Sequence, residues 1–162
     1  MTMPAQKPGR SKQDYATPPA LLEAVLDQFG IEAWAWDLAA DTTNAVCLHY
    51  FSLLDDSLKQ DWAAVLEGGW GWLNPPFAHI RPWVQKAHEE QQQRGAHVAM
   101  LLPAGVGANW WRDWVHEKAA IYFLNGRLTF VGETTPYPKD CAIVVYGAGS
   151  PCYEVWNWRA AS

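Results

Sequence analysis

The sequence predicts an α/β fold with a mostly parallel central sheet and helices on both faces. Short apolar runs alternate with amphipathic stretches along the chain, a pattern typical of strands joined by crossover helices. Hydrophobic residues make up 49% of the 162 residues and charged residues 18%, which excludes a disordered chain. Because there is no internal repeat and no long linker, we predict a flexible basic tail at residues 1–14 and a single domain at residues 15–162.

The first element expected is a helix that ends at Phe29. Thr17 is its predicted N-cap, Pro18 its first helical residue and Gly30 its stop signal. Two more helices are expected at residues 80–93 and about 108–118. Strand candidates are the apolar runs at residues 33–38, 70–73, 97–102, 120–124, 141–146 and 153–158, with a further apolar piece at 46–51 and the start of a hairpin or flap at 127–131.

The net charge of −5 is unevenly distributed. Residues 1–13 contain three of the 12 lysines and arginines and no acid, which leaves nine basic against all 17 acidic residues in the rest of the chain. Because neutralising phosphates supplies most non-specific affinity for nucleic acids, such a partner must meet a local basic face or bind weakly. Among the 11 tryptophans, most are expected in the core, and several are candidates for stacking on bases.

Targeting signals and metal-ligand patterns are not apparent in the sequence. No apolar run approaches the roughly 20 residues of a membrane span, and the polar, proline-rich start is unlike a signal peptide. The three cysteines are far apart, and the five histidines lack the spacing of metal ligands. We therefore expect a soluble cytoplasmic protein without disulfides or a metal site.

Two polar residues stand where predicted strands end. Asp37 closes the apolar run at 33–38, and Asn74 directly follows the run at 70–73. In open α/β sheets, ligands bind outside the carboxyl ends of the strands. We therefore expect Asp37 and Asn74 to face one crevice, although either residue could simply form a turn.

The most informative segment is Asn74-Pro75-Pro76-Phe77. The two prolines stiffen the loop and remove two N–H donors, so the Asn74 side-chain oxygen and the Pro75 carbonyl form a rigid pair of acceptors. Together with the flat ring of Phe77, this pair suits an exocyclic amine on a planar ring. Accepting both amine hydrogens favours the tetrahedral nitrogen of an attacking nucleophile, and no strong base is needed. The alternative is an ordinary Pro-Pro turn.

This tetrapeptide matches the (D/N/S)-P-P-(Y/F/W) motif of amino methyltransferases. The chain also resembles the phage-type, Dam-like DNA N6-adenine methyltransferases over about residues 13–146. Further segments carry this resemblance in the same order, namely Tyr15-Ala16-Thr17-Pro18, Asp37-Leu38-Ala39-Ala40, Asp55-Asp56-Ser57-Leu58 with Asp61-Trp62, Met100 to Ala104, and Gly126-Arg127-Leu128-Thr129-Phe130.

The resemblance implies a Rossmann-like class I methyltransferase fold that uses S-adenosylmethionine. The implied reaction is methyl transfer to N6 of adenine in DNA, with Asn74, Pro75, Pro76 and Phe77 as catalytic residues. Because no segment is long enough for a separate recognition domain, we expect low sequence specificity from the loops at residues 104–110 and 131–140.

Matching positions imply cofactor contacts from Tyr15, Thr17, Pro18, Asp37, Ala39, Asp56, Asp61, Trp62 and Asn74. In this interpretation Asp37 meets the methionyl amino group, Asp61 and Trp62 bracket the adenine of the cofactor, and Asp55 or Asp56 binds the ribose. Ala39 stands where many methyltransferases have glycine.

The basic residues are candidates for contacts with the DNA substrate. Arg81 and Lys86 follow the motif on a predicted helix, and Arg127 follows the turn at Gly126. A solvated helix face is the alternative for Arg81 and Lys86. For the whole chain, the alternatives are a methyltransferase for RNA bases or protein glutamine, and a non-catalytic nucleic-acid-binding relic of the fold.

Overall fold

The fold was analysed in a computed structural model that describes residues 15–160. The predicted tail at residues 1–14 lies outside the described residues, so its flexibility stays a prediction. The assignment of residues 15–162 to one domain likewise stays a prediction.

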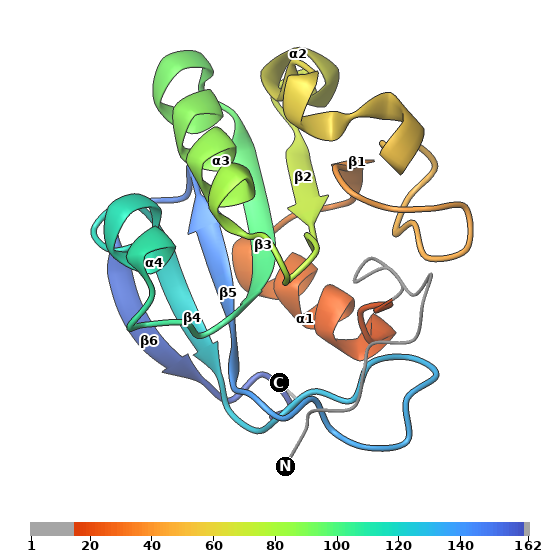
Figure 1. The fold of residues 1–162 in the computed structure, drawn as a ribbon, viewed down its shortest axis with the longest axis vertical. Coiled ribbons are helices and arrows are strands. Elements are labelled where there is room, and N and C mark those ends of the chain that lie inside the picture. Colours follow the sequence, from red (N-terminus) through yellow and green to blue (C-terminus); the bar gives the residue numbers. More distant parts are fainter. Residues whose placement is uncertain (1–14, 161–162) are drawn as a thin grey trace.

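A six-stranded sheet forms the centre of the structure (Figure 1). Its strands are β1 (Trp34–Asp37), β2 (Trp70–Leu73), β3 (His97–Pro103), β4 (Ala120–Leu124), β5 (Cys141–Tyr146) and β6 (Cys152–Trp156). They lie in the order β1-β2-β3-β5-β4-β6. Strands β1, β2 and β3 are parallel, as are β4 and β6, whereas β5 is antiparallel to both of its neighbours.

The sheet is therefore mixed, which confirms the predicted parallel sheet only in part. The exception is β5, which runs against the other five strands, and Figure 1 shows its arrow opposed to those of β2, β4 and β6. The connection from β4 to β5 contains no helix in residues 125–140 and includes Gly126 and Gly132 at positive φ. Without a crossover helix the chain returns from the edge at which β4 ends, so β5 must run the other way.

Helices cover both faces of the sheet, as predicted (Figure 1). The helices are α1 (Pro19–Phe29), α2 (Trp62–Leu66), α3 (Arg81–Arg94) and α4 (Asn109–Trp114), and two 3-10 turns span Leu53–Asp55 and Ser57–Lys59. Helix α1 packs on one face through Leu21 and Val25. Helices α2, α3 and α4 pack on the other face, where Trp62, Val84 and Trp111 join one core cluster.

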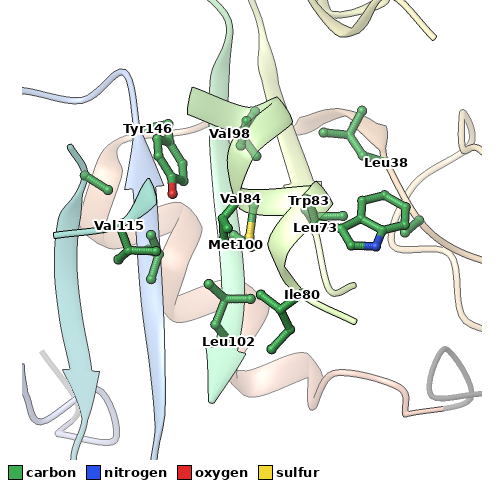
Figure 2. Close-up of a cluster of buried hydrophobic side chains, with 14 of the residues drawn as sticks. Leu38, Leu73, Ile80, Trp83, Val84, Val98, Met100, Leu102, Val115 and Tyr146 are labelled. Carbon is green, nitrogen blue, oxygen red and sulfur yellow. The ribbon is translucent and has the colours of Figure 1, made fainter. Parts of the chain in front are cut away.

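Successive side chains of β3 point to opposite faces of the sheet and so contribute to both core clusters. Val98, Met100 and Leu102 belong to the cluster beneath α3, whereas Ala99 and Leu101 belong to the cluster beneath α1. Figure 2 shows the first cluster, in which these β3 side chains meet residues of α3 and its N-cap as well as residues of the neighbouring strands. Because β3 is buried on both faces, the carboxyl edge of the central sheet is rigidly placed.

Three local predictions were wrong in detail. Helix α1 has Pro18 as its N-cap and Pro19 as its first residue, and no side chain caps it, because the Thr17 hydroxyl is bonded elsewhere. Helix α4 ends at Trp114 rather than about residue 118, since the chain tightens there and Glu117 takes a positive φ of 61°. The short helix α2 was not predicted, although Asp61 caps it by accepting the Ala64 N–H.

The apolar piece at 46–51 forms only a single parallel bridge, between Tyr50 and Asp37. Backbone hydrogen bonds of 2.9 Å join the Asp37 N–H to the His49 carbonyl and the Phe51 N–H to the Asp37 carbonyl. This segment therefore extends the sheet beyond β1 just where Asp37 ends that strand.

Candidate active site

The Asn74–Phe77 loop begins at the residue after β2, which lies between β1 and β3. Trp72, Leu73 and Pro75 are buried, so the sheet and the core fix the start of the loop. The described residues contain no cis peptide bond, so both prolines follow trans bonds. The loop is therefore held rigidly at the carboxyl edge of the parallel strands.

The side chain of Asn74 is held through its nitrogen. Its Nδ2 donates to the Tyr15 carbonyl at 2.9 Å and to the Thr17 Oγ1 at 3.1 Å. Because a carbonyl only accepts, Nδ2 must face Tyr15, and Oδ1 is turned away from it. Within residues 15–160, no hydrogen bond reaches Asn74 Oδ1 or the Pro75 carbonyl. Both oxygens of the acceptor pair predicted from the sequence are thus without a hydrogen-bond partner among the described residues, and Pro75 itself is buried.

Asp37 is a buried carboxyl group, with 2% of its surface exposed. Its Oδ1 accepts the Ala39 N–H at 3.2 Å, and its Oδ2 accepts the Val46 N–H at 3.1 Å. Burial raises the pKa of Asp37 to about 7 in spite of these two hydrogen bonds. In the described part of the chain no cation pairs with this group, so a ligand that brings a positive charge would stabilise its ionised form.

Asp37 and Asn74 share a narrow pocket, as their places at two strand ends predicted. Tyr15, Thr17 and Ala39 also line it, and its volume of about 10 Å³ is room for about one water molecule. Pro18 is not among the lining residues and instead is the N-cap of helix α1. The structure therefore brings together five of the nine residues predicted to contact the cofactor, namely Tyr15, Thr17, Asp37, Ala39 and Asn74, at a site too small for a cofactor without movement.

A second small cavity, of about 80 Å³, adjoins the first through Ala39, which lines both. Asp56 lines this cavity, and its half-exposed side chain pairs with the exposed Lys59 at 3.4 Å. The carboxylate of Asp55 is occupied locally, because it accepts the Ser52 N–H at 2.7 Å and the Ser52 hydroxyl at 3.0 Å. Of Asp55 and Asp56, the two acids proposed for the ribose, only Asp56 lines this cavity.

A wide cleft of about 900 Å³ opens on the other side of the motif loop. Its lining includes Phe77, the loops that follow β3 and β4, and the approach to β5. The ring of Phe77 packs edge-on against Tyr137 at 5.6 Å, and burial raises the pKa of Tyr137 to about 12, which keeps its hydroxyl neutral. The predicted recognition loops at 104–110 and 131–140 both reach this cleft, through Trp110 and Lys139.

Arg127, predicted to contact the DNA substrate, lines the cleft with its Nε 3.8 Å from the Asp140 carboxylate. Lys139 and Trp110 were not among the residues predicted individually for the site. Trp110 lies across Gly105, where a Cβ would come within 2.7 Å of the indole ring. The sequence did contain a signal for this contact, because Gly105 and Trp110 lie close together just after the strand predicted at 97–102.

Arg81 and Lys86 are not placed at the cleft, and the structure does not support their predicted contact with the substrate. Arg81 pairs with Asp113 on α4 at 2.9 Å. Lys86 is largely buried, pairs with Glu90 at 3.3 Å and lies 5.1 Å from the centre of the Trp62 ring. Helical spacing placed Arg81 and Lys86 on one helix, as the sequence predicted. In the folded protein, however, Asp113 and Glu90 pair with these two cations.

Asp61 and Trp62 do not fit the predicted bracket around a cofactor adenine. Trp62 is fully buried, and its indole N–H donates to the Ser57 carbonyl at 2.9 Å. Asp61 caps α2 and pairs with Arg94 at 2.6 Å. Neither residue lines the cavities beside Ala39, whereas Phe51 and Trp83 do line the 80 Å³ cavity.

Comparison with known proteins identifies the class to which this fold and site belong. A family model described as "DNA N-6-adenine-methyltransferase (Dam)" matches residues 5–144. The match covers most of the chain, so the protein belongs to the Dam family, and the resemblance predicted from the sequence is confirmed.

Two relatives are named DNA N-6-adenine-methyltransferase. The protein of Escherichia phage T1 is 29% identical over 115 residues, which are 71% of this chain and 46% of the relative. That of Haemophilus phage HP1 is 26% identical over 130 residues, which are 80% of this chain and 72% of the relative. The chain thus spans about half the length of the phage T1 protein.

Among solved structures, the chain is similar to the Type IIL restriction-modification enzyme MmeI, which was solved in complex with DNA. The TM-score is 0.47 at 15% identity, over 86% of this chain and 23% of that enzyme.

Within residues 15–160, no helix is both long and apolar enough to span a membrane. The same residues contain no group of three or more histidines, cysteines or acids arranged to hold a metal ion.

Proposed function

We propose that this protein transfers a methyl group from S-adenosylmethionine to N6 of adenine in DNA, on a Rossmann-like methyltransferase fold. The observation that carries the proposal is the placement of the Asn74 amide. Its nitrogen is anchored, its oxygen accepts no hydrogen bond, and it lines a pocket built around a buried acid, three residues before Phe77, which lines a cleft wide enough for a nucleotide. Membership of the Dam family supports the same reaction.

The residues around the narrow pocket fit the chemistry of the cofactor. The buried Asp37 carboxylate, bonded to two backbone N–H groups, suits the methionyl ammonium. Tyr15, Thr17 and Pro18 would cover the methionine part, the small Ala39 lets the backbone approach closely, and Asp56 would accept from the ribose hydroxyls. When bound, the cofactor supplies an electrophilic methyl group on a sulfonium.

On the substrate side, Asn74 Oδ1 and the Pro75 carbonyl would each accept one hydrogen of the adenine amino group. Phe77 would stack on the ring and fix its plane. The amine lone pair is delocalised into the ring, and two acceptors favour the tetrahedral nitrogen in which that lone pair is free to react. Because the amino proton becomes acidic only after alkylation, the neutral Asn74 needs no strong base beside it.

The wide cleft suits the DNA around the target base. In a duplex the adenine must leave the stack to reach Asn74, at a cost of a few kcal/mol. Arg127 and Lys139 line the cleft and would meet phosphates beside the extruded nucleotide. With so few basic residues at the cleft, we expect weak, salt-sensitive binding and low sequence specificity.

The test is to incubate the purified protein with labelled S-adenosylmethionine and unmethylated plasmid DNA, and then to separate the nucleosides. We expect label in N6-methyladenine. Parallel reactions with RNA and with a glutamine-containing peptide test the two other methyl acceptors considered from the sequence. Cofactor binding without label in any DNA would overturn the proposal, and no cofactor binding at millimolar concentration would indicate a non-catalytic relic.

A further inference from the structure

The two hydrogen bonds that anchor Asn74 come from the strap, the segment of residues 15–18. Thr17 contributes its side-chain Oγ1, and Tyr15 contributes its backbone carbonyl. Thr17 is only 8% exposed, and its hydroxyl does not cap the helix that follows. A buried hydroxyl needs a partner, and the partner here is the amide at the start of the Asn-Pro-Pro-Phe motif.

The strap is also attached to the connection between β4 and β5. Ala16 pairs with Val131, whose N–H donates to the Ala16 carbonyl at 3.1 Å. The ring of Tyr15 stacks on Phe130 with a centroid distance of 5.1 Å, and Phe130 in turn contacts Phe77. The strap therefore spans from the narrow pocket to the aromatic residues beside the wide cleft.

We propose that Thr17 is a positioning residue that acts through Asn74. Together with the Tyr15 carbonyl, its hydroxyl fixes which end of the Asn74 amide faces the strap, so that Oδ1 is presented to the amino group of the substrate. This inference rests on the proposed function.

The Asn74 amide needs such a clamp because its two ends have nearly the same shape, but one end accepts hydrogen bonds and the other donates them. Rotation by 180° exchanges Oδ1 and Nδ2 with almost no change in volume. A rotated Asn74 would offer an N–H donor to an amino group that also donates, and the two groups would repel. The Tyr15 carbonyl can only accept, so it opposes the rotated state. The Thr17 hydroxyl adds a second hydrogen bond to Nδ2 in the observed orientation and so strengthens the hold on the amide.

The test compares Thr17→Val with Thr17→Ser. Valine keeps the shape of threonine and removes the hydroxyl, whereas serine keeps the hydroxyl. We expect Thr17→Val to lower kcat about tenfold while the Kd for S-adenosylmethionine stays within about twofold, and Thr17→Ser to retain near wild-type kcat. In an Asn74→Ser background, where no amide remains to be oriented, Thr17→Val should have little further effect.

A second readout does not depend on activity. Hydrogen exchange of the Asn74 side-chain amide, followed by NMR, should be several-fold faster in Thr17→Val than in the wild type or in Thr17→Ser. This measurement separates failure of the inference from failure of the proposed function, because it stands even if the wild type methylates no DNA.

An unchanged kcat and unchanged exchange in a folded Thr17→Val variant would overturn the inference. A higher Kd with unchanged kcat would also overturn it, since Thr17 would then serve only cofactor binding. Should Thr17→Val fail to fold, Thr17→Ala provides the test, because it also removes the hydroxyl. Wild-type kcat together with unchanged exchange of the Asn74 amide in that variant would contradict the proposal.

Discussion

The two cavities beside the motif loop differ in size and in how their charges are held. The pocket of Asp37 and Asn74 is narrow, and its acid and its amide are fixed by hydrogen bonds to the backbone and to the strap. The cleft beside Phe77 is about 900 Å³, and its cations Arg127 and Lys139 stand at an open surface. A small cofactor requires preorganised partners, whereas a polymer requires room and charges that adjust.

The strongest test of this division is Asn74→Ala, which removes the amide that lines the narrow pocket and begins the motif loop. We expect methyl transfer to fall by about 10²–10³-fold or more, because both the acceptor and its orientation are lost. Cofactor affinity should change by less than about threefold, since Asp37 and Ala39 remain. Transfer assays and calorimetry on the same preparation measure the two effects, and a fully active variant would show that the loop is only a turn.

The raised pKa of Asp37 predicts that cofactor affinity at the narrow pocket depends on pH. Its pKa of about 7 means that the group is mostly protonated at pH 6 and must ionise to pair with an ammonium. Affinity for S-adenosylmethionine should therefore fall as the pH falls, by roughly eightfold between pH 7.5 and pH 6. Calorimetry at both pH values measures this change. Asp37→Asn should bind weakly at both, and an equally steep pH dependence in that variant would assign the titration to another group.

The cleft should respond to changes of charge that leave the pocket unaffected. We expect Arg127→Ala and Lys139→Ala each to raise the KM for DNA several-fold and to reduce the salt dependence of DNA binding by about one counterion. The matched controls are Arg81→Ala and Lys86→Ala, whose parent side chains lie on α3 and pair with Asp113 and Glu90. If the controls weaken DNA binding as much as the cleft variants, the DNA path runs over α3 instead.

The smallest effect on activity is expected for Trp62→Phe. Loss of volume and of the indole bond to Ser57 should lower the free energy of unfolding by about 1–3 kcal/mol, as measured by denaturant titration. Cofactor affinity should hardly change in the folded variant. A selective loss of affinity for S-adenosylmethionine would return Trp62 to the adenine-binding role inferred from the family.

Much of the fold and the centre of the site could be predicted from local patterns. Apolar runs placed the strands to within a few residues, and the rule on strand ends brought Asp37 and Asn74 to one pocket. The direction of β5 could not be predicted from its own residues, because it depends on how residues 125–140 return to the sheet.

Site residues were misassigned where long-range partners decide their role. Asp61 and Lys86 have the residue types expected of ligand contacts, yet Arg94 and Glu90 occupy them. Thr17 has the sequence features of a helix cap, but its hydroxyl bonds a residue 57 positions away. Residue type and spacing therefore identify candidates, whereas packing determines which of them remain available to a ligand.

The most direct test of the account is a crystal structure with S-adenosylhomocysteine bound, the product of the proposed transfer. The account predicts the ammonium at Asp37, the strap of residues 15–18 over the amino-acid part, the ribose beside Asp56 and the sulfur facing Asn74 Oδ1. A ligand bound in the wide cleft, or an Asn74 amide turned away from the sulfur, would contradict it.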